Sequence, residues 1–171
     1  MPCAGVIDTL GRMKINFKFV ALAGLLLLLG FGTGYIMNSE SVELDQNPDL
    51  SLPVEPQCVL NEATCVRKLT PSGTIEFSIG PRPIRGASPL TFNLSVDQLD
   101  VQSAAIELKG VSMNMGSYRF DLAADGNGRF TAEGNLPVCI RGQMRWQADV
   151  WLKTRTRGLV KVSYMFTAYK S

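Results

Sequence analysis

The chain has 171 residues, of which 46% are hydrophobic and 19% are charged, and its formal net charge is +2. This length fits one globular domain with an attached segment. The small net charge, with lysines and arginines spread along the chain, gives no basic patch of the kind that binds nucleic acid, so we predict no nucleic-acid partner. The chain contains no histidine, which excludes a Ser-His-Asp triad and an imidazole base, and we do not expect an enzyme.

Residues 19–37, with the sequence FVALAGLLLLLGFGTGYIM, form an uncharged apolar run that is long enough to cross a bilayer as one helix. Arg12, Lys14 and Lys18 precede this run and acidic residues follow it. The positive-inside rule therefore places residues 1–18 in the cytoplasm and the rest of the chain outside, behind a single-pass anchor. A cleaved signal peptide is the alternative, although the run exceeds the usual apolar region of about 7 to 15 residues and no A-x-A-like site follows it.

Residues 38–57, NSESVELDQNPDLSLPVEPQ, contain five acidic residues, no basic residue and three prolines. This composition cannot bury a core and shows neither a helical nor a strand period, so we predict an acidic flexible linker. The folded domain is then expected to span residues 58–171.

Within this domain apolar and polar residues alternate with a period of two, which indicates half-buried strands. The alternation predicts strands at residues 75–79, 90–96, 104–108, 118–122, 129–132, 144–152 and 160–168. The sequence ADGNG at residues 124–128 supplies the Asn and glycines that a tight hairpin requires. We therefore predict an all-β domain, an immunoglobulin-like antiparallel β-sandwich of about seven strands.

Three of the four cysteines lie in this domain. Cys58 and Cys65 bracket the short segment VLNEAT, and outside the cytoplasm such a pair is expected to close a disulfide. Cys139, in LPVCIRG, is then left over as a small buried hydrophobe, a reactive thiol or a metal ligand. Arg141 and Arg145 would favour its thiolate if they point toward it, and so favour reactivity or metal binding.

The segment GVSMNMGSYRF, residues 110–120, carries two methionines two positions apart. If this segment is extended, Met113 and Met115 project from the same face, roughly 7 Å apart. Two thioethers with a third sulfur nearby suit Cu(I), because soft ligands select it over hard ions, and Cys139 and Met144 are the candidate third ligands. The alternative is that the methionines pack in the core or face a partner. The sequence does not separate these two interpretations.

The order of features resembles the bacterial membrane-anchored periplasmic domains of the FixH and YtkA-like type. The motifs that carry the resemblance lie within residues 74–168 and are GPRPIRGASPLTFNLSV, IELKGVSMNMG and GNGRFTAEGNLPVCIRGQMRWQADVWL. It implies a single-pass protein of the bacterial inner membrane with a periplasmic domain, acting in respiratory oxidase assembly or copper delivery beside an oxidase or a copper chaperone. It also implies Met113 and Met115 as the site. This chain differs from that family in having no histidine beside the methionine turn and in carrying CVLNEATC.

A metal-free periplasmic interaction module that docks on an inner-membrane complex is the second function that the sequence supports. Trp151 lies on the polar face of its strand, out of step with its neighbours, so we expect it to be exposed as a contact anchor together with Arg141 and Arg145. Its alternative role is to cover the second face of the sheet. Burial of both Met113 and Met115 would contradict the copper interpretation and leave this one untouched.

Overall fold

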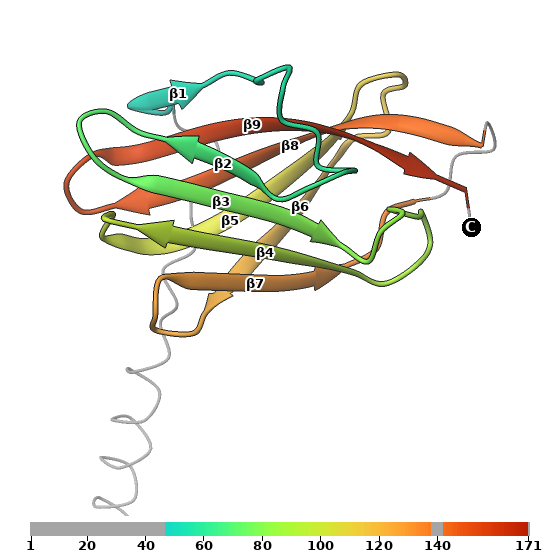
Figure 1. Cartoon of the computed structure of the whole chain (residues 1–171). Coiled ribbons are helices and arrows are strands. Elements are labelled where there is room, and N and C mark those ends of the chain that lie inside the picture. Colours follow the sequence, from blue (N-terminus) through green and yellow to red (C-terminus); the bar gives the residue numbers. More distant parts are fainter. Residues whose placement is uncertain (1–46, 138–141, 171) are drawn as a thin grey trace, which may run out of the picture. The chain divides into compact units, whose positions relative to one another are not determined.

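The computed structural model of the chain describes residues 47–137 and 142–170 (Figure 1). Within these residues the secondary structure consists of strands. They are β1 (Leu50–Leu52), β2 (Cys65–Lys68), β3 (Thr74–Gly80), β4 (Leu90–Asp97), β5 (Val101–Gly110), β6 (Ser117–Ala124), β7 (Arg129–Gly134), β8 (Gln143–Thr154) and β9 (Gly158–Tyr169). The predicted all-β class is therefore confirmed for the described part of the domain.

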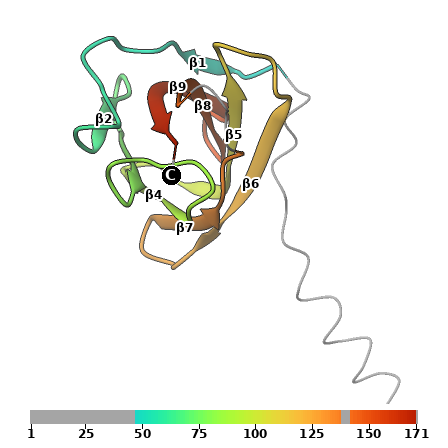
Figure 2. The ribbon, with the colours of Figure 1, turned by 90° about the vertical axis from the view of Figure 1, so that its right-hand side faces the viewer.

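The strands form one sheet in the order β1-β9-β8-β5-β6-β7-β4-β3-β2, in which only β1 and β9 pair in parallel. Strand β6 carries the sheet around a corner, because it pairs with β5 from Ser117 to Leu122 but with β7 only at Ala123 and Ala124. The sheet curls on itself around this strand (Figure 2). Nine strands in one curled sheet replace the expected seven, and the immunoglobulin-like arrangement is not confirmed.

The core lies inside the curl, where the apolar residues of each alternating pattern meet. Phe77 of β3 contacts Tyr164 of β9 with ring centroids 5.2 Å apart, so the two halves of the sheet touch across the interior. Burying side chains of this size contributes roughly 1.5–3 kcal/mol each. The largest side chains with under 2% exposure are Trp146, Tyr164, Phe77, Phe92, Leu60, Ile75, Ile79, Ile84, Leu90, Leu94, Ile106 and Leu108.

The alternation of the sequence locates β3 to β9, and the hairpin at residues 124–128 is confirmed. Asp125 Oδ1 accepts a hydrogen bond from the Asn127 N–H at 2.8 Å, and Gly126 and Gly128 take positive φ angles of 85° and 73°. Glycine is the residue that adopts this conformation without strain. The period of two in the sequence therefore reports correctly which residues face the core.

Strand β1 corrects the linker prediction, because it lies within residues 38–57. Leu50–Leu52 pair with Val160–Val162 of β9, and the Asp49 N–H donates to the Leu159 carbonyl at 2.8 Å. Main-chain hydrogen bonds to a long strand order this segment although it has few apolar side chains. The folded part of the chain therefore begins before Cys58.

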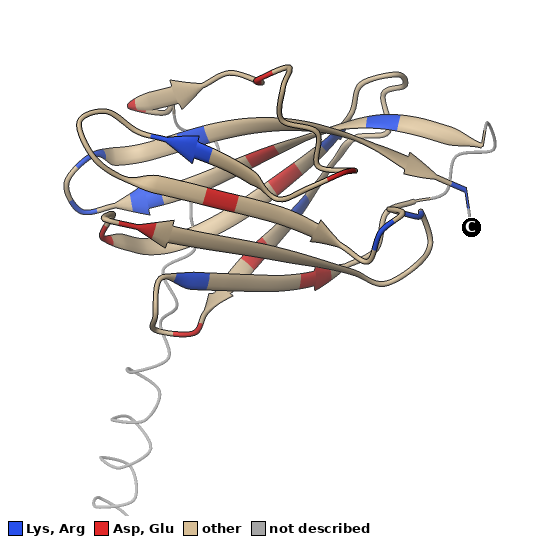
Figure 3. Ribbon diagram, viewed as in Figure 1, with Lys and Arg blue, Asp and Glu red and all other residues tan. Residues whose placement is uncertain are grey.

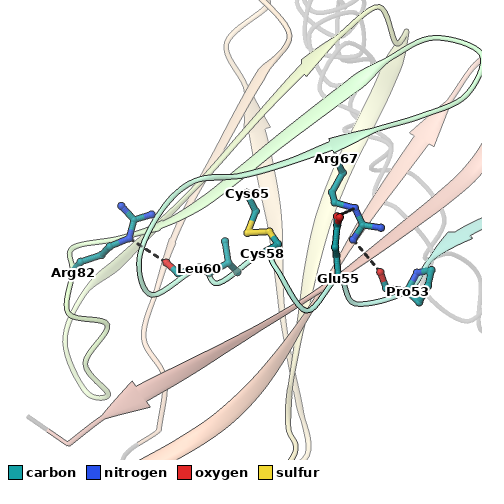
Figure 4. The surroundings of a disulfide bond; sticks show 7 residues. All are labelled: Pro53, Glu55, Cys58, Leu60, Cys65, Arg67 and Arg82. Carbon is teal, nitrogen blue, oxygen red and sulfur yellow. Dashed lines mark hydrogen bonds and ion pairs between the residues drawn. A yellow bond between two sulfur atoms is a disulfide. The ribbon is translucent and has the colours of Figure 1, made fainter.

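The predicted disulfide between Cys58 and Cys65 is present, with the two Cα atoms 5.5 Å apart (Figure 4). Beside it Arg67 of β2 forms a salt bridge with Glu55 at 3.1 Å and donates to the Pro53 carbonyl at 2.9 Å. These contacts connect β2, at one edge of the sheet, to the segment that follows β1 at the other edge. The disulfide thus lies where the two edges approach each other.

Basic and acidic residues are interspersed over the strands (Figure 3). Several of them pair within one strand, as Arg119 does with Asp121 at 2.6 Å and Lys109 with Glu107 at 2.8 Å. Across residues 47–137 and 142–170 we find no helix with the length and apolar character to span a bilayer. The predicted membrane helix at residues 19–37 and the predicted cytoplasmic residues 1–18 lie outside the described residues.

Candidate functional site

The two methionines of the sequence motif lie in residues 111–116, the short connection between β5 and β6. The Val111 N–H donates to the Arg145 carbonyl at 3.0 Å, so this loop begins against the first residues of β8. At its other end the Gly116 N–H donates to the Asn114 side-chain oxygen at 3.1 Å, and Gly116 has a φ of 76°. The loop is therefore attached to β8 at its start and closed by a tight turn at its end.

Gly110, the last residue of β5, is the point at which this methionine loop meets β8. A Cβ atom placed on Gly110 would fall on the methyl group of Met144 and 2.5 Å from the Met113 carbonyl oxygen. The space beside the glycine is thus filled by Met144 from one side and by the Met113 main chain from the other. The structure brings Met144, one of the two candidate third ligands, against the loop.

The three methionines differ in exposure. Met113 is 40% exposed, Met115 is half-buried and packs against the core, and Met144 is 3% exposed. The condition that would contradict the copper interpretation, burial of both Met113 and Met115, is therefore not met. The three residues thus range from exposed to buried, and each carries a thioether, which is a soft donor.

Cys139 and Arg141, which the sequence also nominates, lie in residues 138–141, outside the described residues. Arg145 is exposed on β8, where its main chain supports the methionine loop. It also lines a groove with Val59 and Phe166. The structure therefore places Arg145 at the surface beside the loop.

The prediction that Trp151 is exposed is wrong, because only 4% of this residue is accessible. Trp151 forms a small cluster with Ala105 and Leu159, and the Lys161 ammonium lies 5.3 Å from its ring centroid. Ala105 is the cross-strand partner of Trp151 on β5, and its small side chain leaves room for the indole. Trp151 covers the second face of the sheet, which is the alternative role predicted for it.

Asp149 alternates with the core-facing residues of β8, yet it is only 1% exposed. Its Oδ1 atom accepts hydrogen bonds from Ser163 at 2.6 Å and Gln147 at 2.8 Å, and its Oδ2 atom lies 3.7 Å from the Lys109 ammonium. Burial lowers the pKa of Lys109, but hydrogen bonds and charges from Glu107 and Asp149 outweigh it and raise this pKa overall. These contacts join β5, β8 and β9. A period of two in the sequence does not predict them, because the period shows on which face of the sheet a side chain lies but not what covers that face.

Residues 47–137 and 142–170 contain no group of three or more Cys, Asp, Glu or His side chains that could hold a metal ion.

No family model and no curated protein matches the chain. Among solved structures it is similar to an engineered protein, with 19% identity over 64% of this chain and 20% of that chain and a TM-score of 0.38. A DUF4785 family protein from Legionella pneumophila has 15% identity over 58% of this chain and 29% of that chain, with a TM-score of 0.45. CopC from Methylosinus trichosporium has 9% identity over 63% of this chain and 95% of that chain, with a TM-score of 0.35. Similarities this distant assign neither a family nor a function.

Proposed function

We propose that this protein is a membrane-anchored periplasmic accessory protein, not an enzyme, that binds Cu(I) through methionine sulfurs in respiratory oxidase assembly or copper delivery. The observation that supports the proposal is that the Met144 methyl group and the main-chain carbonyl of Met113 both lie beside Gly110. Two residues that are distant in the sequence approach each other there, in a loop whose remaining methionine, Met115, is half-buried.

The donor set suits Cu(I) for a chemical reason. Thioether sulfur is a soft, uncharged ligand, and soft ligands select Cu(I) over hard divalent ions. Met113 is the exposed member and can receive the ion, while Met115 and Met144 lie deeper. The Cys139 thiolate, shortly before β8 in the sequence, is the further ligand that we propose. An oxidase or a copper chaperone is the proposed partner.

The proposed location rests on two features of the chain. Residues 19–37 have the length and composition of a membrane anchor, and the preceding charges orient it with the domain outside the cytoplasm. The Cys58–Cys65 disulfide is consistent with an oxidising compartment such as the periplasm.

The test is an anaerobic Cu(I) titration of the full-length chain against a competing chelator. We expect stoichiometric binding that weakens about tenfold or more in the Met113→Leu/Met115→Leu variant, because a ligand pair is lost. Met165→Leu is the matched control, since this half-buried methionine lies on β9 opposite Gln147 and outside the loop. A folded wild-type chain that binds no Cu(I), or a double variant that binds as tightly as the wild type, would contradict the proposal.

One observation favours a metal-free interaction module as the second candidate function. Val111 and Met113 are 44% and 40% exposed, and they lie beside the exposed Arg145. Exposed apolar residues next to an arginine are typical of a contact surface. A photo-crosslinking residue at position 112 of the full-length chain, used in membranes with and without a copper chelator, separates the two functions. Adducts that form equally in both conditions support docking without metal.

A further inference from the structure

Strands β6 and β7 leave their common hairpin in different directions (Figures 1 and 2). Their pairing consists of Ala123 with Thr131 and Ala124 with Phe130. Beyond these pairs a groove of about 690 Å³ opens between the two strands. It is lined by Thr91, Arg119, Phe120, Asp121, Ala123, Thr131, Ala132 and Glu133.

Main-chain groups point into this groove from both sides. The Asp125 N–H donates across the hairpin to the Arg129 carbonyl at 3.0 Å. Alternate residues of a strand direct their N–H and C=O groups to the same side. The main-chain groups of Asp121 on β6 therefore face β7, and those of Glu133 on β7 face β6. Because the pairing of the described strands stops at Ala123, these groups face the groove and not each other.

The floor of the groove is aromatic. Phe120 is half-buried, and its ring lies 5.1 Å from the ring of Phe92, measured between centroids. The same ring lies over Gly134, where a Cβ atom would come within 2.7 Å of the Phe120 Cζ atom. Glycine at this position therefore leaves room for the Phe120 ring beside β7.

Two exposed carboxylates line the groove, Asp121 from β6 and Glu133 from β7. Asp121 is paired with Arg119 at 2.6 Å, whereas Glu133 forms no salt bridge with any residue that the structure describes. A positively charged side chain bound in the groove would pair with the Glu133 carboxylate and would form a second ion pair with Asp121 beside Arg119.

We propose that this groove receives one extended segment of a partner protein, which adds as a short strand to the main chain of β6. Strand addition of this kind takes its affinity from main-chain hydrogen bonds and its specificity from alternate side chains. The segment would direct small apolar residues toward Phe120 and a Lys or Arg toward Asp121 and Glu133. This inference does not depend on copper binding.

The probe for the test is the synthetic peptide acetyl-Val-Lys-Val-Thr-Val-amide, added to the ¹⁵N-labelled full-length chain. We expect NMR shifts and slower hydrogen exchange at the amides of Asp121 and Glu133. The same peptide with alternate amides N-methylated should bind about tenfold more weakly, because it loses one or two main-chain hydrogen bonds. No shift at these two amides up to the solubility limit of the peptide, or equal binding of the N-methylated form, would overturn the proposal.

Two variants, with one control, test the β7 wall and the floor of the groove. Glu133→Gln should weaken the peptide about two- to fivefold through the lost charge, whereas Glu76→Gln, at an exposed acid on β3, should not change its binding. Gly134→Ala should force the Phe120 ring into the groove and abolish binding. Sedimentation of the chain alone tests whether a second copy of the chain fills the groove instead. A concentration-dependent dimer that Glu133→Gln dissociates would show this and would overturn the assignment to a partner protein.

Discussion

Replacing Gly110 by alanine tests the geometry on which the copper proposal depends. The added Cβ would lie 2.5 Å from the Met113 carbonyl oxygen, whereas real Cβ contacts are essentially never shorter than 3.0 Å. The loop main chain must therefore retreat by about half an ångström, and the 3% exposed Met144 must find a new position for its methyl group within a packed core. Overpacking of this kind costs roughly 1–3 kcal/mol, so we expect Gly110→Ala to lower the free energy of unfolding by that amount.

Urea unfolding of the full-length chain in detergent, followed by the fluorescence of its tryptophans, measures this loss. Gly80→Ala is the matched control, because a Cβ on Gly80 would meet no atom within 4 Å, and it should change the free energy by less than about 0.5 kcal/mol. We also expect Gly110→Ala to weaken Cu(I) binding, since it displaces Met113 from Met144. A Gly110→Ala variant that is as stable as the wild type would refute the reasoning, because Met144 and the loop would then not meet at this glycine.

Further predictions concern other parts of the fold. The Tyr164 hydroxyl is buried with no hydrogen-bond partner among the described residues, so Tyr164→Phe should raise the free energy of unfolding by about 1 kcal/mol in urea. Burial raises the pKa of Tyr164 above the unfolded value of 10.0, so the neutral hydroxyl contributes its full stability below pH 10.0 and the protein loses this contribution as the pH rises further. Tyr164→Phe should therefore reduce the loss of stability at alkaline pH, measured as the free energy of unfolding against pH. Replacing both Cys58 and Cys65 by serine should cost about 2–3 kcal/mol, and dithiothreitol should destabilise the wild type but not this variant. Asp149→Ala should cost about 2–3 kcal/mol, because it leaves buried donors unpaired, whereas Lys109→Met should cost much less, because the Lys109 side chain is 46% exposed and screened by water.

The strands that the sequence reveals are those with a long alternating pattern. Residues 75–79 and 90–96 alternate because one face of β3 and β4 is buried and the other is solvated, and this is the cause of a period of two. Strand β1 has three residues and gains its order from main-chain bonds to β9, which leave no pattern in the side chains. Strand β2, with four residues, is too short for the period to be recognised.

The candidate site could be predicted only in part, because its contacts depend on strand register. The sequence nominates Met144 as a ligand, but its approach to the loop follows from the pairing of Gly110 with Trp146, which no local pattern encodes. The error at Trp151 has the same origin. Burial of its indole depends on Ala105, opposite it on β5, and on Leu159 of β9. Alternation identifies the face on which a side chain lies, but the neighbouring strands determine whether that face is covered.

Gly110 and Gly134 have the same role at the last positions of two different strands, β5 and β7. Each ends its strand, and each lies where a larger side chain from another strand crosses the main chain: Met144 at Gly110 and Phe120 at Gly134. Because one glycine borders the methionine loop and the other borders the β6–β7 groove, alanine at each position should impair a different activity. We expect Gly110→Ala to weaken Cu(I) binding and leave the probe peptide unaffected, and Gly134→Ala to produce the opposite pattern, with both measured on folded full-length chains. If either variant impairs both activities while the chain remains folded, the two sites are coupled through β6, which connects the loop to the groove, and their independence is refuted.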